Sequence, residues 1–267
     1  MIELGVLGAA DVRAAFRGDL YGEAETMSEE WFAGHIACND VDIARSARWI
    51  EDGELSGIAL LALRGERAWI GGFGVVPALR GRGLAARYLA ETLDLARDAG
   101  ARTVELEVLA QNAAAIAVYR KGGFETIGEL AVWSRDPLAP AAPRAVAPRS
   151  FSVGEVASVA RVPSTCWQRE PRSVAAWSPA ELVLAGPAAE PAAYAFVGRT
   201  GARATVLDAG ARDAAAAEVL LVELDRAVPD QRLMLPNEPP EGPLHDALFA
   251  SGRWTQPVRQ HRMRAVL

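Results

Sequence analysis

The run Arg80-Gly-Arg-Gly-Leu-Ala85 has the composition of an anion-binding loop. Its two glycines leave backbone N–H groups open to a ligand, and its two arginines add positive charge. It follows an apolar stretch that ends at Pro77 and precedes a segment with helical periodicity, so its amides would lie at a helix N-terminus. The run therefore predicts phosphate or pyrophosphate binding. The alternative is a glycine turn that starts a helix and binds no ligand. Neither the triphosphate loop nor the dinucleotide fingerprint has this spacing.

Two glutamates, Glu105 and Glu107, interrupt an otherwise apolar strand pattern at 103–109. They share one face of that strand, because successive side chains alternate between faces. A carboxylate on an inner strand is costly unless it is paired or hydrated. Further along, Asn112 and Tyr119 are seven residues apart in a helical segment, so both point to the same side. Glu107 and Tyr119 carry groups that could transfer protons.

These residues need a scaffold, and the hydrophobic periodicity predicts one of mixed type. Helical patterns and shorter strand patterns alternate, and several strands are joined by tight turns. We expect an α+β fold in three layers, with a central mixed, mostly antiparallel sheet flanked by helices. The expected elements of the first half are helices at 10–20, 28–36, 84–99 and 113–121, and strands at 42–50, 56–63, 69–77, 103–109 and 124–133.

A proline- and alanine-rich stretch separates two halves of the chain. Its prolines favour extended backbone, and it shows no periodicity. The second half repeats the order of helix and strand patterns of the first, which indicates a divergent internal duplication. We therefore expect a domain at 1–136, a linker at 137–149 and a domain at 150–267, the last without a glycine-rich loop of its own.

Composition excludes several classes of protein. The net charge of −6 argues against non-specific nucleic-acid binding, and no apolar run reaches the ~20 residues of a membrane span. The two cysteines are too few for a disulfide framework, and the three histidines lack metal-ligand spacing, so no metal is expected. The N-terminus lacks a signal-peptide pattern, from which we expect a cytoplasmic protein. A monomer and a homodimer both remain compatible with the sequence.

The loop, the strand before it and the residues after it together resemble the GCN5-related N-acetyltransferase family over about residues 43–130. In that family an Arg/Gln-x-x-Gly-x-Gly/Ala motif binds the pyrophosphate of acetyl-CoA, and Arg80, Gly83 and Ala85 match it. The resemblance implies acetyl-CoA as cofactor and a preceding strand that splays from its neighbour and offers its backbone to the pantetheine and the thioester. The implied cofactor-binding residues are Gly74, Val75, Val76, Arg80, Gly81, Arg82, Gly83, Leu84, Ala85, Asn112 and Tyr119.

The same resemblance implies residues for the proton transfers of an acetyltransferase. An amine must lose a proton to attack a thioester, and the departing thiolate must gain one. Tyr119 matches the late motif of the family and is the implied general acid, with a buried core aromatic as the alternative. Residues 106–124 resemble the branch that acetylates ribosomal-protein N-termini, which implies Glu107 as general base, directly or through water. An ion-paired structural glutamate and a mechanism with water alone are the alternatives.

The resemblance implies a small-molecule or peptide primary amine as the acceptor. An acidic stretch between the first two expected helices could steer a cationic amine, or it is a solvated helix start; it contains Glu23, Glu25, Glu29 and Glu30. The duplicated layout also resembles the mycothiol synthases, which are tandem acetyltransferases. A further alternative, from a different class, is a regulatory protein that binds acyl-CoA without turnover.

Overall fold

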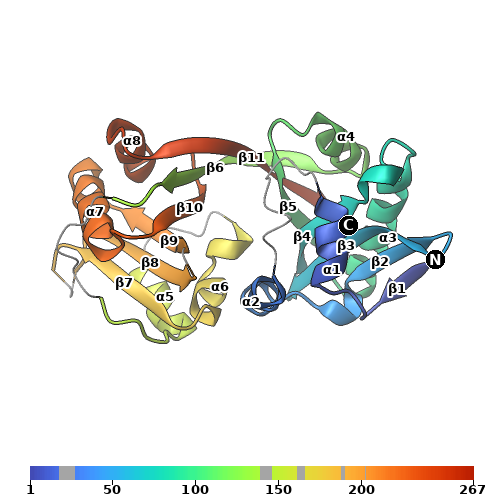
Figure 1. Cartoon of the computed structure of the whole chain (residues 1–267), viewed down its shortest axis with the longest axis horizontal. Coiled ribbons are helices and arrows are strands. Elements are labelled where there is room, and N and C mark those ends of the chain that lie inside the picture. The colour runs from blue at the N-terminus through green and yellow to red at the C-terminus, as the bar shows by residue number, and fades with distance from the viewer. Residues whose placement is uncertain (18–27, 139–145, 161–165, 188–189, 202) are drawn as a thin grey trace. The chain divides into compact units, whose positions relative to one another are not determined.

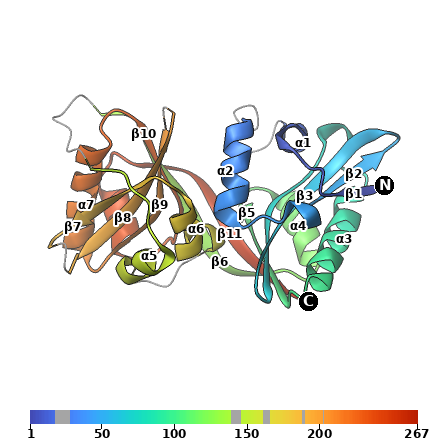
Figure 2. The same ribbon diagram turned by 90° about the horizontal axis from the view of Figure 1, so that it is seen from below.

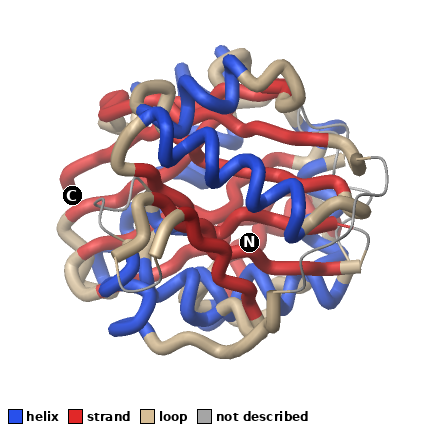
Figure 3. The backbone as a smooth tube through the Cα atoms, turned by 90° about the vertical axis from the view of Figure 1, so that its left-hand side faces the viewer, coloured by secondary structure: helices blue, strands red, loops and turns tan. Residues whose placement is uncertain are grey.

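The chain forms two compact units. Met1–Gly128 and His261–Leu267 make up the first unit, and Glu129–Gln260 makes up the second. Figure 1 labels the helices and strands, and Figure 3 separates them by colour. The computed structural model describes residues 1–17, 28–138, 146–160, 166–187, 190–201 and 203–267.

The sheet of the first unit follows the order β1-β2-β3-β4-β5-β11. The turn-linked strands β2, β3 and β4 pair antiparallel, and β1 also pairs antiparallel with β2, whereas β4 and β5 are parallel and are joined through a helix. Only the last residues of β11 belong to this unit. The strands are β1 (Ile2–Leu4), β2 (Ala47–Glu51), β3 (Glu54–Arg64), β4 (Arg67–Val75), β5 (Thr103–Leu109) and β11 (Thr255–Val266).

Two helices cover one face of this sheet. Leu93 of α3 and Ile116 of α4 share a buried cluster with Ile70 and Leu106, so the even-numbered residues of β5 point toward these helices. Figure 2 shows α3 running alongside the strands of its unit. Glu105 and Glu107, the odd-numbered residues, therefore lie on the opposite face. The helices and 3₁₀ turns of this unit are α1 (Ala9–Phe16), α2 (Glu29–Asn39), η2 (Ile43–Arg45), η3 (Pro77–Leu79), α3 (Leu84–Asp98) and α4 (Ala113–Lys121).

One expected strand begins later than its apolar pattern suggested. Residues 43–45 form the 3₁₀ turn η2, and β2 begins at Ala47. The turn is held by Ser46, whose hydroxyl donates to the carbonyl of Asp42 at 2.8 Å. Such local side-chain bonds compete with strand pairing, so this part of the 42–50 prediction was wrong.

The second unit repeats the plan of the first. Three antiparallel strands β7, β8 and β9 lead into helix α7, then β10 pairs in parallel with β9 before helix α8. Its core contains Leu220 and Leu224 of α7 with Leu233 and Leu248. The elements are β6 (Glu125–Arg135), α5 (Val153–Val159), η4 (Trp167–Arg169), α6 (Pro171–Ala176), β7 (Ala180–Ala185), β8 (Ala193–Thr200), β9 (Arg203–Ala211), α7 (Ala214–Ala227), β10 (Arg232–Glu238) and α8 (Pro243–Ala250). The expected α+β fold and its duplication are confirmed.

The compact units do not follow the expected domain boundaries. Residues 129–136 belong to the second unit rather than to the first, and residues 261–267 return to the first. Both differences arise because β6 and β11 each run across a boundary, and such long strands pair in more than one unit. The expected linker at 137–149 includes residues 139–145, which lie outside the described residues.

Candidate active site

The glycine loop forms the N-terminus of α3. Gly81 and Gly83 both have a φ of 79°, in the left-handed region that favours glycine. An added Cβ would meet nothing within 4 Å at either position, so backbone conformation and not crowding requires glycine here. Gly83 is the N-cap residue and supplies no side-chain cap. The first-turn amides at Leu84 and Ala85 therefore face outward at the positive end of a long helix.

Arg80 does not extend freely from this loop. Its Nε donates to the carbonyl of Val75 at 3.0 Å, and one terminal nitrogen donates to the carbonyls of Ala15 at 3.1 Å and Arg17 at 3.5 Å. These contacts join the end of β4 to the end of α1. Arg80 and Arg82 are both exposed. Arg80 thus has a structural role in shaping the loop, which sequence reasoning did not foresee.

The strand before the loop separates from its parallel neighbour. Among the described residues, β4 and β5 pair from Arg67–Thr103 to Trp69–Glu105 and no further. A β-bulge at Gly71 lies just beyond the last pair, because Leu60 pairs with Gly72 and Leu61 with Ile70. The splay that the resemblance implied is present, and it opens a gap between the two strands toward their C-terminal ends.

The predicted backbone ligands lie along the end of β4. An added Cβ at Gly74 would lie 3.4 Å from Ala15, so α1 packs close to the strand here. Val75 is buried and pairs with Gly57, and the amide of Val76 donates to the carbonyl of Ser56 at 2.9 Å. This segment lies beside the gap, and several of its polar groups already have partners within the protein; its role in cofactor binding stays a prediction.

Asn112 and Tyr119 are both placed by α4. The Oδ1 atom of Asn112 accepts from the amide of Ala115 at 3.1 Å, so Asn112 is the N-cap of the helix. Tyr119 is buried between Phe73 and Phe124, whose ring centroids lie 6.0 and 5.7 Å away. Burial raises the pKa of Tyr119 well above its usual value. Its hydroxyl has no hydrogen-bond partner within the described ranges and keeps its proton at neutral pH.

Glu107 is half-buried with its Oε1 atom shielded from solvent, and only one of its oxygens has a partner within the described residues. Trp69 Nε1 donates to Oε2 at 2.7 Å, whereas no described residue hydrogen-bonds to Oε1. Burial raises the pKa of Glu107 to about 7, with a smaller contribution from the nearby Glu105, although the hydrogen bond from Trp69 and the charge of Arg262 both act to lower it. A carboxyl group with this pKa exchanges protons readily at neutral pH, as a general base must.

Its neighbour on the same face is the ion-paired glutamate. Glu105 accepts from Arg262 at 2.9 Å and from Arg264 at 2.8 Å, and its side chain is 3% exposed. Although burial alone would raise the pKa of Glu105, the two guanidinium groups lower it below the usual value. The pKa is therefore lowered at one of the two carboxyl groups of β5, Glu105, and raised at the other, Glu107.

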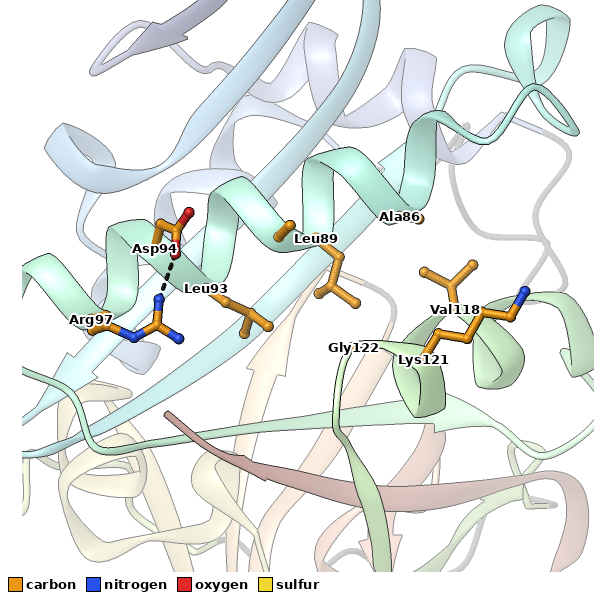
Figure 4. A pocket seen from close by; sticks show the side chains of 9 residues that line it. Ala86, Leu89, Leu93, Asp94, Arg97, Val118, Lys121 and Gly122 are labelled. Atoms are coloured by element: carbon orange, nitrogen blue, oxygen red, sulfur yellow. Dashed lines mark hydrogen bonds and ion pairs between the residues drawn. The ribbon is translucent and has the colours of Figure 1, made fainter.

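A groove of about 300 Å³ runs between α3 and α4. Figure 4 shows Leu89 and Leu93 of α3 on one side of it and Val118 of α4 on the other. Arg97, which bonds to Asp94, and Lys121 bring positive charge to its rim. It is lined by Ala86, Leu89, Ala90, Leu93, Asp94, Arg97, Val118, Lys121 and Gly122. Since Ala86 belongs to the first turn of α3, the groove begins close to the glycine loop.

The parallel strands of the second unit also separate after three described pairs, but there a buried side chain bridges them. The described pairs of β9 and β10 end at Thr205–Met234. Beyond them Arg169 bridges the strands, donating to the carbonyls of Ala209 at 2.6 Å and Asn237 at 3.1 Å. The same buried guanidinium pairs with Asp208 at 2.8 Å and Glu238 at 2.6 Å. A charged side chain thus occupies the place that is open in the first unit.

The acceptor side is described in part. Glu23 and Glu25 lie outside the described residues. Glu29 and Glu30 are the first two residues of α2, and the carboxylate of Glu29 lies 3.5 Å from the guanidinium of Arg13. Sequence reasoning missed the aromatic contacts of Trp69 and the two arginines near the C-terminus. No sequence pattern signals Arg262 and Arg264, because they lie more than 150 positions from Glu105.

Two other kinds of site are absent from the described ranges. None of the helices there is long and apolar enough to cross a membrane. Within the same part of the chain, His, Cys, Asp and Glu form no group of three or more that could hold a metal ion.

Comparison with known proteins gives matches in both sequence and fold. The model of the acetyltransferase (GNAT) family matches residues 11–124. A mycothiol acetyltransferase of Clavibacter michiganensis is 37% identical over 108 residues, which are 40% of this chain and 32% of that protein. The N-alpha-acetyltransferase RimI of Mycobacterium tuberculosis is 49% identical over 55 residues, 21% of this chain and 33% of that protein. The matches thus span about a third of the length of these relatives.

Solved structures resemble the whole chain. A GCN5-related N-acetyltransferase from Sphaerobacter thermophilus has a TM-score of 0.63 at 18% identity and covers 100% of this chain and 95% of its own. A tandem GNAT protein from the clavulanic acid biosynthesis pathway has a TM-score of 0.60 at 18% identity, and the match covers 83% of this chain and 82% of that protein. At these identities the likeness concerns the fold, which is that of two such units in tandem.

Proposed function

We propose that the chain transfers an acetyl group from acetyl-CoA to a primary amine, because the model of the acetyltransferase (GNAT) family matches residues 11–124. The observation that carries the proposal is the half-buried Glu107, which has a pKa of about 7 and one oxygen without a partner within the described residues. It lies on β5, beside the gap that opens between β4 and β5.

The residues of the first unit fit the cofactor. The uncapped amides at the start of α3 and the exposed Arg82 would bind the pyrophosphate, since they combine open donors with positive charge. Arg80 would act indirectly, by holding the loop through Val75 and Ala15. The groove beside α3 would take an apolar part of the cofactor near a cationic rim. Once bound, acetyl-CoA supplies an activated acyl group as a thioester.

In the proposed reaction the amine nitrogen forms a bond to the acyl carbon, and the bond from that carbon to sulfur breaks. Glu107 accepts the proton that the amine loses, directly or through one water. Its ionised form is abundant above pH 7 because its pKa lies there. The bond from Trp69 to Oε2 fixes the carboxylate and leaves Oε1 for the proton.

Tyr119 would return a proton to the departing thiolate. Glu107 points from one face of β5, and Tyr119 belongs to the cluster on the other face. An acid and a base on opposite faces of a splayed strand suit a substrate that passes through the gap, because the two protons are exchanged at different atoms, the attacking nitrogen and the departing sulfur. Asn112 would contribute by capping α4 and so positioning Tyr119.

Each chain would hold one acetyl-CoA. In the second unit the guanidinium of Arg169 satisfies the strand carbonyls that an open gap would offer to a ligand. Titration calorimetry with coenzyme A tests this: one molecule per chain is expected, and two molecules per chain would overturn the assignment.

The cofactor site is tested by thermal unfolding. Acetyl-CoA at millimolar concentration should raise the Tm, and Gly83→Glu should abolish the rise by placing a carboxylate among the phosphate-binding amides. Gly100→Glu is the matched control, since Gly100 also has positive φ, 85°, and follows the other end of α3. The proposal fails if wild-type protein shows no shift, or if the two variants respond alike.

Two relatives suggest which amines to test. The name of the Clavibacter relative, mycothiol acetyltransferase, suggests an amine of the mycothiol type, and that of the tuberculosis relative, N-alpha-acetyltransferase, suggests an α-amine. Coenzyme A release with each amine distinguishes these acceptors. An acyl-CoA-binding regulator would release none with any amine, whereas an enzyme would lose rate on Glu107→Gln and Tyr119→Phe.

A further inference from the structure

His35 of α2 has a shielded ring nitrogen that the proposed reaction does not use. The backbone of Gly71 hydrogen-bonds the imidazole and raises its pKa, as a carbonyl acceptor does, but burial has the larger effect and lowers the pKa to about 4. Nε2 has no partner in the described part of the chain, so the nitrogen bound to Gly71 is Nδ1. The ring is therefore neutral at pH 7, with a proton on Nδ1 and an open lone pair on Nε2.

The strand backbone provides the support that fixes this tautomer. Gly71 is the extra residue of the β-bulge, where the regular register with β3 is interrupted. An added Cβ at Gly71 would lie 2.3 Å from the ring of Trp69, so glycine is required for the indole to lie against the strand. One irregularity of β4 thus positions both the imidazole and the indole.

Aromatic rings flank the imidazole. Trp31 stacks on His35 with centroids 5.0 Å apart and an interplanar angle of 14°, and Trp69 lies 5.8 Å away. The same Trp69 donates to Glu107. Trp31 is 38% exposed, so this aromatic wall reaches the surface. Two shielded acceptor atoms, His35 Nε2 and Glu107 Oε1, therefore neighbour one indole.

We propose that His35 Nε2 accepts a hydrogen bond from the acceptor substrate, and that this substrate is a primary amine with a second N–H or O–H donor beside a flat or apolar group. The inference rests on the proposed function, because it takes Glu107 to receive the amine's proton. Two shielded acceptors without donors favour a ligand rich in N–H or O–H groups and disfavour an anion. The tryptophans supply the flat contact surface.

His35→Phe tests the assignment, because it keeps an aromatic ring in the stack and removes the acceptor. With tyramine as probe, which carries a primary amine, a flat ring and a hydroxyl, we expect a KM for the amine about 10- to 100-fold higher. The KM for acetyl-CoA should not change. His35→Gln, which restores a side-chain acceptor, should recover part of the loss.

His245→Phe is the matched control. His245 also contacts a tryptophan, Trp133, at 5.3 Å and also has a shielded ring nitrogen without a described partner, but it lies in the second unit. This variant should leave the KM for tyramine unchanged. Equal KM values for His35→Phe and wild type, or equal effects of both phenylalanine variants, would overturn the inference.

A second measurement separates this inference from the proposed function. If no amine supports coenzyme A release, the proposed function fails, yet binding can still be followed by NMR of ¹⁵N-histidine-labelled protein. The Nε2 resonance of His35 should shift on addition of tyramine while that of His245 stays fixed. An unchanged His35 resonance at saturating tyramine would show that the nitrogen does not bind such a ligand.

Discussion

The opposed states of Glu105 and Glu107 lead to a quantitative prediction about stability. Glu107 has a pKa of about 7 in the folded chain against an ordinary value of 4.5, because burial disfavours its charged form. A group whose pKa is raised on folding stabilises the folded state below its unfolded pKa, and that contribution is lost as the pH rises through the folded pKa. Ionised Glu107 is thus a source of instability at pH 8.

Replacing Glu107 by glutamine should therefore stabilise the protein at high pH. A shift from 4.5 to about 7 corresponds to about 3 kcal/mol at 1.36 kcal/mol per pH unit. Most of this difference develops between pH 5 and pH 7, so the gain should be about 2–3 kcal/mol larger at pH 8 than at pH 5. The amide oxygen of the new side chain would still accept from Trp69. Urea unfolding of both proteins at the two pH values, with unchanged m-values, measures the difference.

Glu105→Gln is the control with the opposite sign. It removes a carboxylate that two guanidinium groups hold ionised, and it should cost about 1–3 kcal/mol at pH 8. Since the pKa of Glu105 is lowered in the folded state, this deficit should shrink as the pH falls below about 4.5. If Glu107→Gln showed no pH-dependent gain, or if both variants changed stability in the same direction, the electrostatic reasoning would be refuted.

The remaining predictions concern single residues. Arg169→Leu should destabilise the chain by about 3–5 kcal/mol in urea unfolding, because it leaves Asp208 and Glu238 buried without their cation; a loss below about 1 kcal/mol would contradict this. Asn112→Ala should cost about 1 kcal/mol as a lost N-cap, and a large rise in the acetyl-CoA KM without that loss would assign it to the cofactor instead. Tyr119→Phe should lower kcat by about 10²-fold or more and leave the Tm nearly unchanged, since its hydroxyl has no described partner; equal kcat values would exclude it as the acid.

Local sequence patterns correctly predicted much of the fold. The glycine loop at the start of α3 follows from glycines that need positive φ and from the helical stripe after them. The alternation at 103–109 correctly placed Glu105 and Glu107 on one face of β5. The repeated order of patterns correctly indicated a second unit of the same plan. These features depend on contacts between near neighbours in the chain, which sequence patterns record directly.

The domain boundaries were harder to predict because they depend on strand pairing. The proline-rich stretch 137–149 suggested a division there, yet the compact units divide within β6, after Gly128, and within β11, after Gln260. Strand pairing over such distances leaves no periodic signal, because either strand has the same pattern whichever partner it meets. The functional roles of the predicted site residues remain predictions for the experiments above.

The sequence by itself determined the family resemblance, the phosphate-type loop and the presence of two glutamates on one strand face. Only the tertiary structure decided which glutamate is ion-paired and which keeps a carboxylate oxygen without a partner among the described residues. The cause is that the partners of Glu105 come from the last residues of the chain, while Glu107 meets an indole from β4 and no cation directly among the described residues. The pKa of a carboxyl group is set by what surrounds it in space, and so the same residue type at two neighbouring positions acquires opposite roles.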